Sequence, residues 1–242
     1  MWLLKKKKKS DAQPSWQSAL FARDREEIAE ALLDMAQKAV ALAGDALDCL
    51  ASGDEERAKA VVARDAEVDE LEVVIEDLCL GALALRQPVR EDLRFVFSTL
   101  KTITDLERVG DQGVNIARRV KAHGQGSLPK ICEEFGPMMS LAQSMVTDAV
   151  AALVNDDAEL AQDVVRRDDQ VDRYQRQIYG SLLDELRRHA DSDLLASEIT
   201  ALVIISRVIE RIGDHGANIA ERAYFAHKGT RLGGEEDANE HR

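Results

Sequence analysis

Acidic side chains recur at helical spacing in two nearly identical segments of this sequence. ERVGDQGVNIAR begins at Glu107 and ERIGDHGANIAE begins at Glu210, so equivalent positions lie 103 residues apart (210 minus 107). Side chains four apart lie on one face of a helix, each about 40° further round than the last. Glu107 and Asp111 therefore share a face, as do Glu210 and Asp214. Because both faces continue apolar stripes, these carboxylates need a partner: unpaired buried charge is strongly destabilising.

Two further acidic pairs show the same spacing and the same offset between copies. Asp65 and Asp69 border one apolar stripe, and Asp168 and Asp172 border another. Each half of the chain thus offers two acidic pairs on neighbouring helices, and like charges brought together repel. Oxygen-only ligands favour hard ions over structural zinc. The eight residues therefore predict a site for a divalent or trivalent hard ion such as Mg, Mn or Fe, with more than one ion bridged where the pairs meet.

A second interpretation of the same carboxylates stays open. Acidic pairs four apart are common on solvated helix faces, and neighbouring arginines can neutralise them as ordinary ion pairs. The arginines beside the two segments are Arg108, Arg119, Arg211 and Arg222. If a metal is bound, we expect Asn115, Asn218, Arg108 and Arg211 to contact its ligands rather than the ion itself.

Three other polar residues near these stripes are not expected to bind metal. Glu72 and Glu76 prolong one stripe, but Gln175 and Tyr179 occupy the equivalent positions, so both glutamates are interpreted as solvated. His215 replaces a glutamine of the first copy and lies off the acidic face.

Each acidic segment contains two glycines, Gly110 and Gly113 in the first copy and Gly213 and Gly216 in the second. A glycine inside a helix costs about 1 kcal/mol relative to alanine. Their repetition predicts either close approach of another backbone or space for a bulky group beside the carboxylates.

Composition and punctuation predict an all-α protein. Hydrophobic residues make up 45% of the 242 residues and aromatic residues only 4%, with four prolines in all. Helices are expected to end near Cys49, Arg86, Ala122, Val154, His189 and His227. With the 103-residue offset, these six helices form two tandem antiparallel three-helix bundles. The expected segments are a disordered basic tail (1–14), two repeats (15–123 and 124–228) and a frayed polar tail (229–242).

Several classes of function are disfavoured. A net charge of −13 argues against broad nucleic-acid binding. The sequence has no Ser/His/Asp or Cys/His grouping, no phosphate-cradling glycine loop and no Glu-x-x-His, so an enzyme is not expected. Cys49, Cys79 and Cys132 lack metal-binding spacing and fit buried thiols in a reducing compartment. No apolar run approaches the 18 residues typical of a membrane span.

The N-terminal run Lys5–Lys9 departs from the acidic balance of the chain. One interpretation is weak contact with an anionic membrane surface, worth about 1 kcal/mol per lysine. The other is a disordered tail or an artificial extension.

Three stretches together resemble the PhoU family of bacterial phosphate-signalling regulators. They are LALRQPVREDLRFVFSTLKTITDLERVGDQGVNIA from Leu83, ARDAEVDELEVVIEDLCL from Ala63 and VIERIGDHGANIAERAYF from Val208. The likeness covers roughly residues 16–226. It implies two tandem three-helix bundles with metal-binding E/DxxxD motifs and metal clusters on the surface.

The same resemblance implies a biological role. Such a protein is expected to be cytoplasmic, possibly peripheral at the inner face of the membrane, and often a homodimer. It would damp the phosphate-starvation response by contacting the ATPase of the phosphate ABC transporter and a sensor histidine kinase. The alternative functions are an accessory domain of a phosphate transporter without a signalling role and, in another class, a carboxylate–metal phosphohydrolase.

Overall fold

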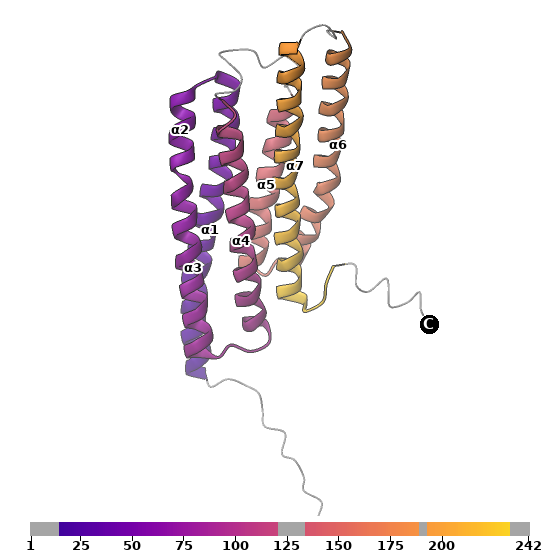
Figure 1. Cartoon of the computed structure of the whole chain (residues 1–242). Helices are drawn as coiled ribbons and strands as arrows, with labels where there is room; N and C mark the ends of the chain where they lie inside the picture. The colour runs from indigo at the N-terminus through magenta and orange to yellow at the C-terminus, as the bar shows by residue number, and fades with distance from the viewer. Residues whose placement is uncertain (1–14, 121–133, 189–192, 233–242) are drawn as a thin grey trace, which may run out of the picture.

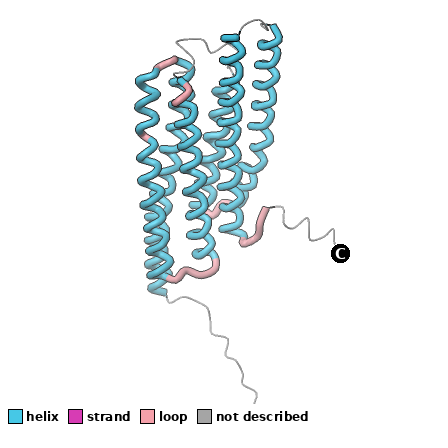
Figure 2. Tube along the Cα trace, viewed as in Figure 1, coloured by secondary structure: helices cyan, strands magenta, loops and turns pink. Residues whose placement is uncertain are grey.

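The structure is a computed structural model that describes residues 15–120, 134–188 and 193–232. Lys5–Lys9 and Cys132 lie outside the described residues. Every regular element within those ranges is a helix (Figure 2). The helices are α1 (Ser15–Ser52), α2 (Glu55–Ala63), α3 (Asp65–Arg86), α4 (Glu91–Ala117), α5 (Phe135–Val154), α6 (Ala158–Arg188) and α7 (Asp193–Lys228).

The helices form two bundles that lie side by side, each built on a three-helix plan (Figure 1). The first contains α1, the successive helices α2 and α3, and α4, and the second contains α5, α6 and α7. Within each bundle the chain reverses direction between helices. The predicted fold class, two tandem antiparallel three-helix bundles related by an internal repeat, is therefore confirmed.

The two repeats pack through equivalent helices. The first helix of each repeat (α1 and α5) and the last (α4 and α7) meet in the middle, while α3 and α6 lie at opposite edges (Figure 1). The Nε2 of Gln143 donates to the backbone oxygen of Val40 over 2.7 Å, and these two residues are separated by 103 positions. Since equivalent residues touch, an approximate twofold axis passes between α1 and α5.

The predicted second helix is divided in the structure. It breaks into α2 and α3 at Arg64, whose backbone N–H is shared between the carbonyls of Ala60 and Val61 at 3.3 and 3.1 Å. Such sharing tightens the turn locally, as in a 3₁₀ helix. In the second repeat α6 runs unbroken. The predicted end of α4 near Ala122 is also wrong, because the helix ends at Ala117.

Similar caps start α2 and α6. Gly53, with φ of 70°, ends α1, and the Asp54 carboxylate accepts the N–H of Arg57 at 2.9 Å. In the second repeat the left-handed position is occupied by Asp156, and Asp157 accepts the N–H of Leu160 at 2.9 Å. Side-chain caps of this kind satisfy N–H groups that the first turn leaves free. They hold each helix pair in the same relative position.

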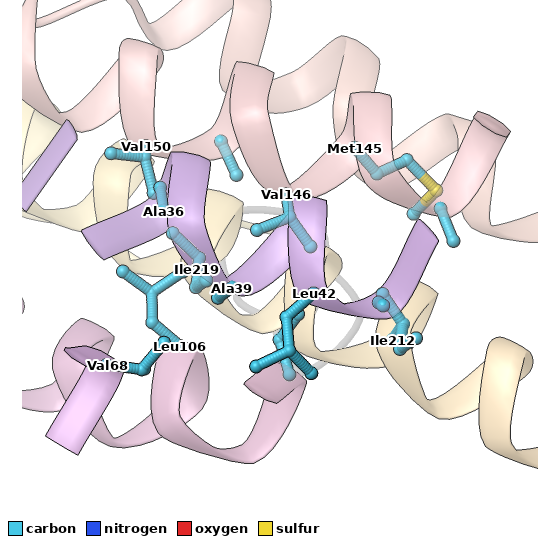
Figure 3. Packing of buried hydrophobic residues seen from close by; sticks show 14 of the residues in the cluster. Ala36, Ala39, Leu42, Val68, Leu106, Met145, Val146, Val150, Ile212 and Ile219 are labelled. Carbon is cyan, nitrogen blue, oxygen red and sulfur yellow. The ribbon is translucent and has the colours of Figure 1, made fainter. Parts of the chain in front are cut away.

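The core is continuous across the two repeats. Figure 3 shows side chains from α1 and α5 meeting those of α3, α4 and α7, with no polar atom among them. The residues labelled there are Ala36, Ala39, Leu42, Val68, Leu106, Met145, Val146, Val150, Ile212 and Ile219. Cys49 and Cys79 are buried free thiols, as predicted, and burial raises the pKa of Cys79 to about 12.

Helix α5 is unusually apolar. Among the described residues it is the one helix long and apolar enough to cross a membrane by length and composition, although no apolar run of that length was expected from the sequence. In the folded chain it packs against α1, α6 and α7, and half of its apolar window is buried there. The core of the bundle accounts for its composition.

Candidate functional site

The acidic pairs of the first repeat lie on the neighbouring helices α3 and α4, near enough for their charges to interact. The Asp65 carboxylate lies against Gly110, where an added Cβ would come within 3.1 Å of its Oδ1. Burial raises the pKa of Asp65, and the charges of Asp69 and Asp111 raise it further. The pKa of Glu107 is raised for the same reasons, first by burial and then by Asp111. Thus the structure brings the four predicted carboxylates of this repeat into range of mutual repulsion.

The second repeat reproduces the arrangement on α6 and α7. Burial raises the pKa of Asp168, and Asp214 and Asp172 are the next two causes. The pKa of Glu210 is raised by burial and by the same two aspartates. For Asp214, burial raises the pKa while the nearby His215 and Arg211 lower it. The predicted grouping therefore recurs, as the sequence repeat requires.

The carboxylates are close without forming a complete ligand set. Within residues 15–120, 134–188 and 193–232, no three Asp, Glu, His or Cys side chains converge closely enough to hold a metal ion. In the first repeat Arg108 neutralises part of the negative charge. Its guanidinium lies 3.3 Å from Glu107 Oε2 and 3.2 Å from Asp111 Oδ2. The donor set suits a hard cation chemically, and the side chains would need to turn toward one another to bind it. Metal binding stays a prediction.

The structure corrects the interpretation of one glutamate. Glu72 was predicted to be solvated, but it is half-buried on α3, and burial raises its pKa. Its charge also raises the pKa of Glu107, so it belongs to the acidic group of the first repeat. Glu76 is exposed, as expected. Of the residues expected beside the ligands, Asn115 is half-buried and Asn218 is exposed.

An ion pair that sequence reasoning missed lies beside each acidic group. The guanidinium of Arg64, next to Asp65, reaches Asp45 Oδ2 of α1 at 2.6 Å. In the second repeat Arg167, next to Asp168, reaches Asp148 Oδ2 of α5 at 2.5 Å. All these residues match at the 103-residue offset. Each ion pair connects the acidic helix to the first helix of its repeat. It thereby holds the adjacent aspartate in position.

Gly113 and Gly216 permit close helix approach. A Cβ on Gly113 would lie 2.9 Å from the backbone N of Ala43 in α1, and one on Gly216 would lie 3.1 Å from the backbone N of Val146 in α5. Of the two explanations left open by the sequence, close backbone approach holds for this pair.

The boundary between α4 and α7 contains a polar cluster found in one copy only. Asp105 is 10% exposed; its Oδ1 lies 2.8 Å from Nδ1 of His215, and its Oδ2 pairs with Arg222. Burial lowers the pKa of His215, so at neutral pH the ring is uncharged and donates its Nδ1 proton to the carboxylate. Arg222 also donates to the backbone oxygen of Lys101 at 3.1 Å. The cluster turns His215 toward α4.

The raised pKa of Asp168 gives a stability prediction. The folded protein disfavours the charged form of Asp168 more than the unfolded chain does. Protonated Asp168 therefore stabilises the fold at pH values below the ordinary carboxyl pKa, and this stabilisation is lost as the pH rises through the pKa of the folded state. Asp168→Asn should therefore stabilise the metal-free protein at pH 7 by about 0.5–1 kcal/mol. Urea unfolding at pH 7 and near pH 3.5 measures this. The gain should vanish at the lower pH, and the exposed neighbour Asp169→Asn should show little effect at either.

Together, the fold and the site define a class of protein, an all-α tandem repeat that presents a group of carboxylates on each half. Comparison with known families gives the particular one. The family model described as the PhoU domain matches twice, at residues 32–120 and 136–223. The chain belongs to the PhoU family.

Individual relatives match over most of the chain. A protein named phosphate-specific transport system accessory protein PhoU homolog from Clostridium acetobutylicum is 31% identical over 88% of this chain and 96% of its own length. A homolog of the same name from Pseudomonas aeruginosa is 34% identical over 88% and 87%. The crystal structure of the phosphate transport system regulatory protein PhoU from Streptococcus pneumoniae superposes with a TM-score of 0.79 at 30% identity, covering 88% of this chain and 99% of that one. These relatives are named accessory or regulatory proteins, and the chain has an accessory role in phosphate transport.

Proposed function

We propose that this protein is a cytoplasmic negative regulator of the phosphate-starvation response and of phosphate uptake. It acts as a metal-binding helical adaptor that links the ATPase of a phosphate ABC transporter to a sensor histidine kinase. The observation that carries the proposal is the recurrence of crowded carboxylates in both repeats of a chain whose relatives serve a phosphate transport system. At neutral pH such crowding disfavours the metal-free state and favours a cation.

In this proposal the metal supplies positive charge to the acidic face. The residues that would hold it are Asp65, Asp69, Glu107 and Asp111 in the first repeat and Asp168, Asp172, Glu210 and Asp214 in the second. Arg108 would release its two carboxylates as the ion enters, since both processes use the same oxygens. Neutralising the face changes which surface charge a partner meets, a local electrostatic change with a regulatory consequence.

The double variant Asp111→Ala/Asp214→Ala tests metal binding. One carboxylate is removed from each acidic group, so bound Mn or Fe measured by elemental analysis should fall severalfold, and repression of phosphate-starvation genes should weaken. A matched control is Glu56→Ala/Asp184→Ala, which removes one exposed, ion-paired acid from each repeat. Metal content equal to that of the unchanged protein in the Asp111/Asp214 variant would refute ligation by these groups.

The partners need a separate measurement. Affinity capture from membranes of cells grown in high and low phosphate should recover the transporter ATPase and the histidine kinase together. Capture of the transporter alone would favour the second candidate, an accessory role without kinase signalling, which the names of the relatives also fit. Light scattering of the purified protein tests the proposed homodimer. Sedimentation with anionic liposomes, with and without Lys5–Lys9→Gln, tests the proposed membrane contact.

A further inference from the structure

A groove of about 480 Å³ lies between α4 and the end of α7. Phe97 and Lys101 of α4 and Phe225 of α7 line it, together with Arg222 and Arg231. The chain as a whole carries a charge of −13, so a cavity with three cationic side chains stands apart from the rest of the surface. Its volume falls within the range of sites for small ligands.

A turn at a glycine after α7 shapes one wall of the groove. α7 ends at Lys228, and Gly229 adopts φ of 75°, with its N–H bonded to the carbonyl of Phe225 at 2.8 Å. This left-handed turn is strained for other residues. After this turn, Arg231 and Leu232 line the groove together with Phe97 and Lys101 of α4.

The partial negative charge at the end of α7 would oppose an anion, and an arginine offsets it. Arg94 of α4 donates to the carbonyl of Ala226 at 2.9 Å, which satisfies a carbonyl that the helix end leaves free. Cations at this position also reduce the negative charge of the helix terminus. The end of α7 is therefore compatible with an anionic ligand nearby.

The groove presents aromatic and cationic groups in the same cavity. Phe97 is 52% exposed, an unusual position for a phenyl ring, and its face is available for stacking. Arg222 is held in place by Asp105 and by the carbonyl of Lys101, which limits the entropy it loses on binding. Arginine and lysine are the side chains that bind phosphate best. Of the residues lining the groove, Glu221 is the acidic one.

We propose that this groove binds a small ligand that joins an aromatic ring to a phosphate, the chemistry of a nucleotide. The ring stacks on Phe97 or Phe225, and the phosphate is held by Lys101 and Arg231 with Arg222 behind them. A ligand with only a ring or only a phosphate would use just one of the two kinds of lining residue, the aromatic or the cationic. The residues that follow Leu232, GGEEDANEHR, contain carboxylates but no aromatic ring. Their chemistry matches the cationic side chains of the groove but not its phenyl rings.

Isothermal titration of the full chain with AMP and ATP tests the proposal, with adenosine and inorganic phosphate as probes that carry one feature each. AMP or ATP should bind, and both single-feature probes should bind at least ~10-fold more weakly. Phe97→Ala and Lys101→Glu should each weaken nucleotide binding about 10-fold. Both side chains are exposed, so thermal melting should show an intact fold.

Matched variants separate the groove from general surface effects. Leu80→Ala removes an exposed apolar side chain from α3, and Arg166→Glu reverses an exposed charge on α6; neither should alter nucleotide binding. A chain ending at Leu232 should bind nucleotide at least as tightly, since all the residues proposed to hold the ligand are kept. Absence of nucleotide binding in both chain lengths overturns the proposal. Inorganic phosphate binding as tightly as AMP, or unchanged binding in the Phe97 variant, also overturns it.

Discussion

Replacing Gly113 by alanine is expected to destabilise the protein by about 1–3 kcal/mol, although alanine favours helix formation. The new methyl group would overlap Leu42 Cδ2 and would lie 2.9 Å from the backbone N of Ala43 and 3.0 Å from its Cα. Leu42 could change its rotamer, but the backbone of α1 could not move without separating α1 from α4. Because these helices form the centre of the first repeat, the whole bundle would repack.

Two other glycines provide the comparison. Gly81, on α3, has no atom within 4 Å of an added Cβ, so Gly81→Ala should stabilise the fold by up to about 1 kcal/mol. Gly216→Ala, whose closest contacts are 3.0–3.1 Å, should fall between them. Urea unfolding of the three variants gives the order. A Gly113 variant as stable as the Gly81 variant would show that the seam between α1 and α4 is loosely packed.

These glycines show what the sequence could and could not predict. A repeated glycine inside a helical pattern implies that something lies close to it, and close approach was one of the two predicted explanations. Which helix approaches is a tertiary fact, because α1 precedes Gly113 by more than sixty positions in the chain. Only the packed bundle identifies Leu42 and Ala43 as the neighbours.

Comparison of the two copies predicted the fold and the paired acids, since both depend on features that repeat. The same offset relates Asp45 to Asp148 and Arg64 to Arg167, so these ion pairs could have been found from it. They were missed because residues 19 positions apart face each other only after two helices pack.

The predictions were least accurate for residues that differ between the two copies. Glu72 was set aside because glutamine replaces it in the second repeat, although burial beside Asp69 depends only on its own repeat. Asp105 corresponds to Val208, so no comparison of repeats could indicate it. Its role comes from the boundary between α4 and α7, where equivalent helices meet but carry different residues at these positions.

That boundary gives the second prediction: Asp105→Ala should destabilise the protein by about 3 kcal/mol. The carboxylate is 10% exposed and is shared by His215 Nδ1, at 2.8 Å, and the guanidinium of Arg222. Without it, the half-buried guanidinium of Arg222 and the half-buried ring N–H of His215 lose their shared acceptor, and leaving a partly desolvated charge unpaired is costly. Asp105→Asn should cost less, because an amide oxygen still accepts one of the two bonds.

A double-mutant cycle distinguishes this pairing from simple loss of packing. Arg222→Ala removes the cation that loses its partner, so the combined Asp105→Ala/Arg222→Ala variant should be more stable than the sum of the two losses by about 1–3 kcal/mol. Asp184→Ala breaks an exposed aspartate–arginine pair on α6 and should cost less than about 1 kcal/mol. Additive losses in the cycle would mean that Asp105 and Arg222 do not stabilise one another.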